Sequence, residues 1–218
     1  MRALIDRILN LLYPPRCVFC HNLMPEDVPV CEHCRRTLPY TEGAGQSQTF
    51  AHISACVSPL YYEGTVRDSL LRYKFHSLTG YAKIYGDFLT KCLDENGISC
   101  DSITWVPLSK RRRRLRGYDQ AQLLAAELAG RRGVPCEALL RKIRNNPAQS
   151  GSGGPAARKA NVAGVYRAAA PEKIAGRRIL LVDDIVTTGA TLSECARMLK
   201  QAGAAEVLAV TVARSRKE

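Results

Sequence analysis

The stretch ILLVDDIVTTGATLSECARML, residues 179–199, decides the fold of this chain. Its first four residues are apolar and predict a short buried strand. A turn of small and hydroxyl-bearing residues follows, and then apolar residues at helical spacing. Thr191 and Glu194 fit a capping box at the start of this helix, and Gly203 fits its end. The stretch therefore predicts a strand, a tight turn and a helix, as in an α/β fold.

The turn is suited to hold a phosphate group. At a helix N-terminus, free backbone N–H groups and the positive end of the helix dipole favour an anion. Gly189 lets the backbone approach the ligand closely, and threonine hydroxyls add donors. We expect the phosphate to be held by the five residues of the turn, Thr187, Thr188, Gly189, Ala190 and Thr191.

Two carboxylates, Asp183 and Asp184, stand between the strand and the turn. In open α/β sheets, ligands bind at the carboxyl ends of the strands. A phosphate site beside paired carboxylates suggests a sugar phosphate, whose vicinal ribose hydroxyls would donate hydrogen bonds to both acids. The alternative is an ordinary strand-to-helix turn with two solvated acids.

The string VDDIVTTGAT, residues 182–191, resembles the motif by which type I phosphoribosyltransferases bind phosphoribosyl pyrophosphate. The resemblance implies that Asp183 and Asp184 are catalytic residues and that Mg²⁺ binds with the ligand. Phosphoribosyl transfer passes through an oxocarbenium-like sugar and needs no protein nucleophile. Catalysis would come from cations on the leaving pyrophosphate, positioning of the ribose and exclusion of water.

The chain has nine cysteines, and four of them form two CxxC pairs near the N-terminus. Four thiolates arranged as a tetrahedron are what a structural zinc ion requires. The surrounding segment is polar and cannot build a core alone, so a metal would hold it together. Redox-active CxxC pairs are the alternative. The predicted zinc ligands are Cys17, Cys20, Cys31 and Cys34.

The other five cysteines show no disulfide pattern, which is typical of a reducing compartment. The N-terminal segment predicts an amphipathic helix over residues 4–12 rather than a signal peptide. No stretch is long enough to span a bilayer. We therefore expect a cytoplasmic protein.

A cationic segment follows a strand predicted at residues 103–106. Six of the seven residues 110–116 are basic, in a chain of formal net charge +12. In the transferase fold the loop after this strand binds pyrophosphate, and arginine can engage phosphate oxygens in a bidentate way. The run is longer than one diphosphate needs, so arginines remain for another partner such as a nucleic acid. The alternative is a solvated cationic loop. The candidate residues are Ser109, Lys110, Arg111, Arg112, Arg113, Arg114 and Arg116.

Strands and helices alternate along the rest of the chain. This alternation predicts an α/β fold with a mostly parallel sheet flanked by helices. The expected strands are residues 53–62, with a break at Pro59, then 103–106, 179–182 and 207–212. The expected helices are 65–74, 81–93, 121–130 and that after the turn. Residues 41–49 are predicted to be a linker, which divides the chain into a zinc-binding module at 1–48 and a phosphoribosyltransferase-like domain at 49–218.

Together with the zinc pairs, two further features resemble the ComF/GntX family. The first is the string RRRRLRGYDQAQLLA at residues 111–125. The second is a set of residues that occur in the order expected for the family, Gln149, Arg158, Asn161 and Gly164. The resemblance implies a role in DNA uptake during natural transformation, with single-stranded DNA and other DNA-uptake proteins as partners. Tyr118 and Tyr166 are the nearby candidates for stacking on bases. The second hypothesis is an active transferase that acts on an unidentified base or amine.

Overall fold

A computed structural model describes residues 14–25, 28–42, 47–76, 78–144 and 162–216. The helix predicted over residues 4–12 and the motif residues Gln149, Arg158 and Asn161 lie outside the described residues. Within them, no helix combines the length and the apolar character needed to cross a membrane.

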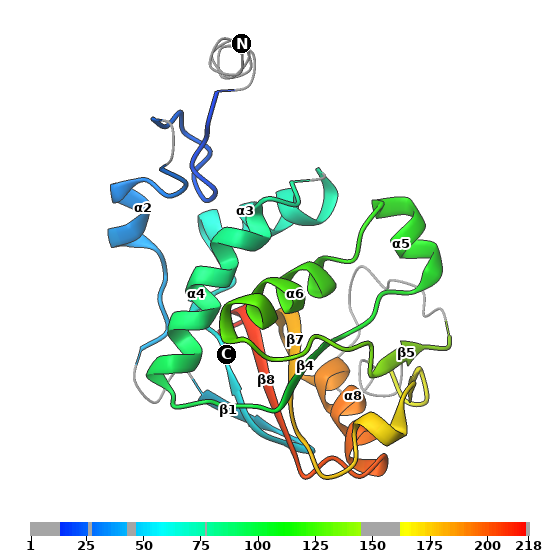
Figure 1. Cartoon of the computed structure of the whole chain (residues 1–218). Helices are drawn as coiled ribbons and strands as arrows, with labels where there is room; N and C mark the ends of the chain where they lie inside the picture. Colours follow the sequence, from blue (N-terminus) through cyan, green and yellow to red (C-terminus); the bar gives the residue numbers. More distant parts are fainter. Residues whose placement is uncertain (1–13, 26–27, 43–46, 77, 145–161, 217–218) are drawn as a thin grey trace.

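The central sheet is mostly parallel, as predicted (Figure 1). In spatial order the strands are β1 (Ser47–Phe50), β2 (Ile53–Val57), β8 (Glu206–Arg214), β7 (Arg178–Val186) and β4 (Ser102–Trp105), while β3 (Leu60–Tyr61) also pairs with β8. Among these described strands only the edge pair β1–β2 is antiparallel, whereas the pairs β2–β8, β3–β8, β7–β8 and β4–β7 are parallel.

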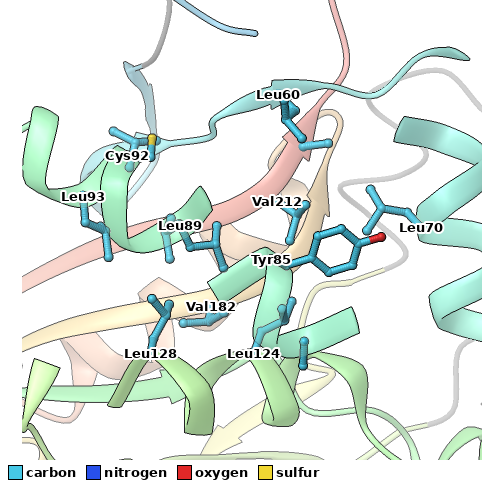
Figure 2. Packing of buried hydrophobic residues seen from close by; sticks show 14 of the residues in the cluster. Leu60, Leu70, Tyr85, Leu89, Cys92, Leu93, Leu124, Leu128, Val182 and Val212 are labelled. Atoms are coloured by element: carbon cyan, nitrogen blue, oxygen red, sulfur yellow. The ribbon is translucent and has the colours of Figure 1, made fainter. Parts of the chain in front are cut away.

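Helices cover both faces of this sheet, so its strands are apolar on both sides. Alternate residues of β7 face two different cores: Leu180 and Val182 belong to one, Ile179 and Leu181 to the other. Figure 2 shows the first core, where side chains of three helices meet Val182 and Val212. The helices of the first core are α3 (Gly64–Phe75), α4 (Tyr81–Glu95) and α6 (Gln120–Arg132), and that of the second is α8 (Ala190–Gln201).

Three segments differ from the sequence prediction. Strand β1 lies inside the predicted linker, where it adds an antiparallel edge to the sheet. The cationic segment forms a short helix, α5 (Lys110–Arg116), instead of a loop. The sequence also did not predict the two-stranded antiparallel ribbon formed by β5 (Leu140–Lys142) and β6 (Tyr166–Ala168). A 3-10 turn, η2 (Pro171–Lys173), leads from this ribbon to β7.

The cysteine-rich segment packs against the larger domain through its first CxxC pair. Phe19 is 1% exposed, and its ring lies edge-on to those of Tyr85 and Phe88 at 6.2 and 5.5 Å. Arg72 of α3 donates hydrogen bonds to the carbonyl oxygens of Val18 and Phe19, at 3.1 and 2.6 Å. The second pair starts the helix α2 (Glu32–Thr37). Because the buried residues of the segment and of the domain form one cluster, the boundary between residues 48 and 49 stays a prediction.

Candidate functional site

The predicted phosphate turn connects the end of β7 to the start of α8. Gly189 is the N-cap residue of α8 and has a φ of 73°, a left-handed conformation that glycine adopts without strain. A cavity of about 60 Å³ lies over the turn, lined by Asp183 and by residues 185–192. A cavity needs roughly 10–15 Å³ to hold one water molecule, so this cavity has room for a phosphate group.

Strand β1 closes one side of the turn. A side chain at position 189 would overlap the ring of Phe50, which is the last residue of β1. The close approach of this ring is a second reason for glycine at position 189, in addition to the backbone conformation. The edge strand that the sequence prediction missed thus packs against the turn at Gly189.

The capping box predicted for α8 is wrong. The N-cap residue is Gly189, and its side chain makes no capping hydrogen bond. Glu194 instead accepts a hydrogen bond at 2.8 Å from the backbone N–H of Gly164 and pairs with Arg197. Glu194 therefore fastens the polypeptide just before β6 to α8, beside the phosphate turn.

The two acids lie within β7 rather than after it, and their carboxylates have different neighbours. Asp184 is 5% exposed, and its Oδ2 atom lies 2.9 Å from the ammonium nitrogen of Lys74. The side-chain amide of Gln120 donates a 3.4 Å hydrogen bond to the same oxygen. The alternative interpretation, an ordinary turn with two solvated acids, is therefore wrong for Asp184, which is buried and paired.

Asp183 lines the cavity over the turn. Its Oδ1 atom accepts a 2.9 Å hydrogen bond from the backbone N–H of Asp184. Burial, and next the negative charge of Asp184, raise the pKa of Asp183 well above its ordinary value. A carboxyl group in this setting gains from a ligand that brings hydroxyl donors or cations.

The cationic helix α5 stands at the same edge of the sheet as the two acids. Its parent strand β4 runs parallel to β7, with Trp105 opposite Val182, so the segments after both strands are neighbours. Ser109 caps α5 by accepting a hydrogen bond from the N–H of Arg112 at 3.3 Å. Asp119 caps α6 and also accepts a 2.9 Å hydrogen bond from the N–H of Leu108. Asp119 thereby fixes both ends of the cationic segment.

The arginines of α5 divide between two environments. Arg112 and Arg116 are half-buried, whereas Arg111, Arg113 and Arg114 are exposed. Burial, and next the charge of Arg112, lower the pKa of Lys142 on β5, while the charge of Asp183 raises it. The charges of Arg112 and Asp183 thus both act on Lys142.

Of the two tyrosines predicted to stack on bases, neither presents a free ring. Tyr166 is 3% exposed, and the ammonium group of Lys142 lies 5.2 Å from its ring centroid. Tyr118 is half-buried, and its hydroxyl donates to the carbonyl oxygen of Tyr73. The prediction that Tyr166 is available to a base is wrong.

Sequence reasoning missed three polar residues of this site, namely Lys74, Gln120 and Lys142. The Oε1 atom of Gln120 is buried and has no hydrogen-bond partner among the described residues. Gln120 belongs to the string RGYDQA, which was a signal that could have identified it. Lys74 and Lys142 sit in ordinary helix and strand patterns, and only the tertiary structure brings them to the acids.

The four predicted metal ligands come together. Their sulfur atoms all lie within 4.8 Å of one another, and those of Cys20 and Cys31 are 3.7 Å apart. At a Zn–S bond length of about 2.3 Å, the edge of a tetrahedral site is roughly 3.8 Å. Burial would raise the pKa of the Cys17 thiol, but backbone N–H groups, that of Cys31 first, outweigh it and lower the pKa to about 7. The geometry fits one structural zinc ion held by Cys17, Cys20, Cys31 and Cys34.

We expect purified protein to contain one zinc ion per chain by metal analysis. Cys20→Ser should lose the metal and lower the melting temperature of the whole chain, because the pair that it disrupts carries Phe19 into the shared core. Cys100→Ser, which changes a half-buried cysteine outside the cluster, should keep both properties. Zinc-free protein with two disulfides would contradict the assignment.

We expect the two acids to respond oppositely to neutralisation. Asp184→Asn leaves Lys74 buried without its carboxylate, which costs about 3–5 kcal/mol and lowers the melting temperature by on the order of 10 °C. Lys74→Met in the same background should restore part of the loss. Equal melting temperatures for wild type and Asp184→Asn would show that the pair does not stabilise the fold.

For Asp183 we expect neutralisation to have the opposite effect on the melting temperature. Its pKa is raised in the folded state, so its ionisation destabilises the fold as pH rises above the ordinary aspartate value of about 3.9. Asp183→Asn removes this penalty. We expect the variant to melt at the same temperature as wild type near pH 4 and above it at higher pH. A gap that stays constant with pH would refute this interpretation.

Comparison with known proteins agrees with this architecture. Residues 116–218 match the phosphoribosyl transferase domain family, and residues 8–45 match the double zinc ribbon domain family. The sheet with helices on both faces and the turn after β7 thus form a type I phosphoribosyltransferase-like fold.

Three curated relatives bear names that refer to competence or to DNA utilization. Competence protein F of Haemophilus influenzae is 31% identical over 117 residues, which are 53% of this chain and 51% of the relative. DNA utilization protein YhgH of Escherichia coli is 36% identical over 109 residues, 49% of this chain and 46% of the relative. Competence protein ComFC of Streptococcus pneumoniae is 28% identical over 200 residues, 89% of this chain and 80% of the relative.

The chain spans about half the length of the first two relatives, and most of the third. Its two domain matches lie in the order that the sequence predicted, zinc ribbon first. The competence proteins among its relatives, together with a phosphoribosyl transferase domain behind a zinc ribbon, support a ComF-family phosphoribosyltransferase-like protein with an N-terminal zinc module.

Proposed function

We propose that this protein binds phosphoribosyl pyrophosphate with Mg²⁺ at the carboxyl end of β7. The observation that carries the proposal is the cavity over the turn, which has glycine in a left-handed conformation at its base and the carboxyl of Asp183 in its wall. A 5′-phosphate there would meet the N-terminal amides of α8. The ribose hydroxyls would donate hydrogen bonds to Asp183 and to Asp184, directly or through water. Asp184 would accept them while paired with Lys74.

The remaining groups of the site suit a pyrophosphate. The start of α5, with Ser109, Lys110 and Arg112, follows β4 at the same edge of the sheet as Asp183. Lys142 of the neighbouring ribbon feels the charges of both Arg112 and Asp183. Mg²⁺ would neutralise part of the charge on the pyrophosphate oxygens. The protein's own part is to bind the phosphates and orient the ribose, with carboxylates on one side and cations on the other.

We further propose that the protein serves DNA uptake in the cytoplasm by binding single-stranded DNA, together with other DNA-uptake proteins. Support comes from the exposed arginines of α5, from the net charge of +12 and from the names of the relatives. A helix with six cations in seven residues suffers like-charge repulsion at its i,i+3 and i,i+4 positions. Phosphate groups of a nucleic acid would relieve it.

An active transferase remains the second candidate. It is favoured by the presence of both acids beside a phosphate turn, which a protein that only binds DNA does not need. In this case the protein would transfer the phosphoribosyl group to an unidentified base or amine. Release of pyrophosphate from phosphoribosyl pyrophosphate and Mg²⁺, dependent on an added acceptor and lost in Asp183→Asn, would establish it.

For the ligand site we expect calorimetry to detect binding of phosphoribosyl pyrophosphate in the presence of Mg²⁺. Asp183→Asn should weaken it by about 10- to 100-fold, because hydrogen bonds to a charged acceptor contribute about 1.5–3 kcal/mol. Asp94→Asn, which changes an exposed acid paired with Arg132, should bind as wild type does. Equal affinities for wild type and Asp183→Asn would refute the sugar-phosphate site.

For DNA we expect sequence-independent binding that weakens steeply with salt, because released counterions drive it. The triple variant Arg111→Gln, Arg113→Gln and Arg114→Gln should lower the affinity for all single-stranded sequences. It should also reduce the slope of log affinity against log salt by roughly 2, at about 0.7 per lost phosphate contact.

The matched control removes the same charge elsewhere on the surface, through Arg36→Gln, Arg67→Gln and Lys91→Gln. It should keep the affinity and the slope of the wild type. If both triple variants lose affinity equally, net charge rather than α5 is responsible. Strong preference for one sequence would also contradict the proposal.

A further inference from the structure

Phe75 is the most exposed aromatic side chain in the described part of the chain, at 62%. It is the last residue of α3 and follows Lys74, whose ammonium group pairs with Asp184 in the candidate site. The phenyl ring therefore lies at the outer margin of that site. Its hydrophobic surface has no function in the core, since none of the ring–ring contacts among the described residues involves it.

The ring of Phe75 is held next to the cationic helix. The guanidinium carbon of Arg116, the last residue of α5, lies 4.8 Å from its centroid. Among the described residues no carboxylate pairs with Arg116. The contrast is Arg216, which stacks on Tyr61 but also forms a bidentate pair with Glu63. The guanidinium group of Arg116 is thus available to pair with an anionic ligand.

The position of this pair is rigid on both sides. Just after Arg116, the hydroxyl of Tyr118 donates to the backbone carbonyl of Tyr73, and the two rings lie 6.2 Å apart. Just before Phe75, Lys74 is fixed by Asp184. An aromatic ring and a guanidinium group held by such anchors are pre-organised for a planar ligand.

We propose that Phe75, with Arg116, is a stacking platform for one nucleobase of a bound DNA single strand. Single-strand binding proteins combine cations that follow the backbone with aromatic rings on which bases stack. Here α5 supplies the cations, and Phe75 supplies the exposed ring beside them. A free nucleobase has the same planar chemistry, but small ligands are mostly enclosed. A ring with 62% of its surface exposed instead suits a base that the flanking phosphates hold in place.

The proposal rests on the proposed binding of single-stranded DNA, and the test separates the two. The affinities of wild type, Phe75→Leu and Phe75→Trp are measured for an oligo-dT strand and for an abasic strand of equal length and charge. Phe75→Leu should weaken binding of oligo-dT by about 5- to 100-fold. Its affinity for the abasic strand and its salt slope should match the wild type, since stacking does not involve charge. Phe75→Trp should restore oligo-dT binding.

Two controls exclude simpler explanations. Leu23→Ala removes an equally exposed apolar side chain, 63% exposed, from the zinc-binding segment and should bind both strands as wild type does. The melting temperature of Phe75→Leu shows whether the variant is folded, and Phe75→Trp gives a second reading through quenching of its indole fluorescence by oligo-dT.

The outcomes are distinct. If wild type binds neither strand, the proposed DNA function is wrong, and the stacking platform with it. If wild type binds oligo-dT but Phe75→Leu binds it equally well, or loses the abasic strand to the same extent, only the platform is wrong. Tighter binding of free thymidine than of oligo-dT, with the same loss in Phe75→Leu, would replace the DNA base by a small-molecule acceptor.

Discussion

The ion pair between Lys74 and Asp184 joins helix α3 to strand β7 at the candidate site. Lys74 belongs to α3 and Asp184 to β7, and both side chains are largely withdrawn from water, at 17% and 7% exposure. A buried ion pair contributes little net stability, yet breaking it is costly because one charge is left without a partner. The pair therefore mainly fixes the position of α3 relative to the sheet, because any movement of α3 away from it would leave a buried charge without its partner. Burial, and next the charge of Asp184, raise the pKa of the neighbouring Asp183.

Helix α3 extends this constraint to the zinc-binding segment. At its middle, Ser69 and Arg72 donate hydrogen bonds to the backbone carbonyls of the first CxxC pair. At its end, Lys74 and Phe75 reach the ligand site. Those carbonyls have a defined position only while the cysteines around them are held, which is what the metal does. Helix α3 thus connects the backbone of the first CxxC pair to Lys74 and the candidate site.

The sequence predicted what is encoded locally. The strand, turn and helix around Gly189 and the four zinc ligands are short strings whose chemistry can be recognised without the fold. Contacts between distant segments could not be read in this way: Phe50 against Gly189, Lys74 against Asp184 and Phe19 in the core all arise from tertiary packing. The capping box failed for a related reason. Glu194 had the correct spacing, but Gly189 occupies the N-cap position. The carboxylate of Glu194 instead accepts a hydrogen bond from the backbone N–H of Gly164.

The helical form of α5 explains how one cationic segment can serve two anions. As an extended loop, its arginines would point in no fixed pattern, but a helix places residues four apart on the same face. Arg112 and Arg116 share such a face and are half-buried, while Arg111, Arg113 and Arg114 are exposed. The inner face suits a pyrophosphate within the site, and the outer face suits a backbone that passes over it. The two proposed ligands would then draw on different side chains of one helix, except at Arg116, which lies over the ring of Phe75 and would be shared between them.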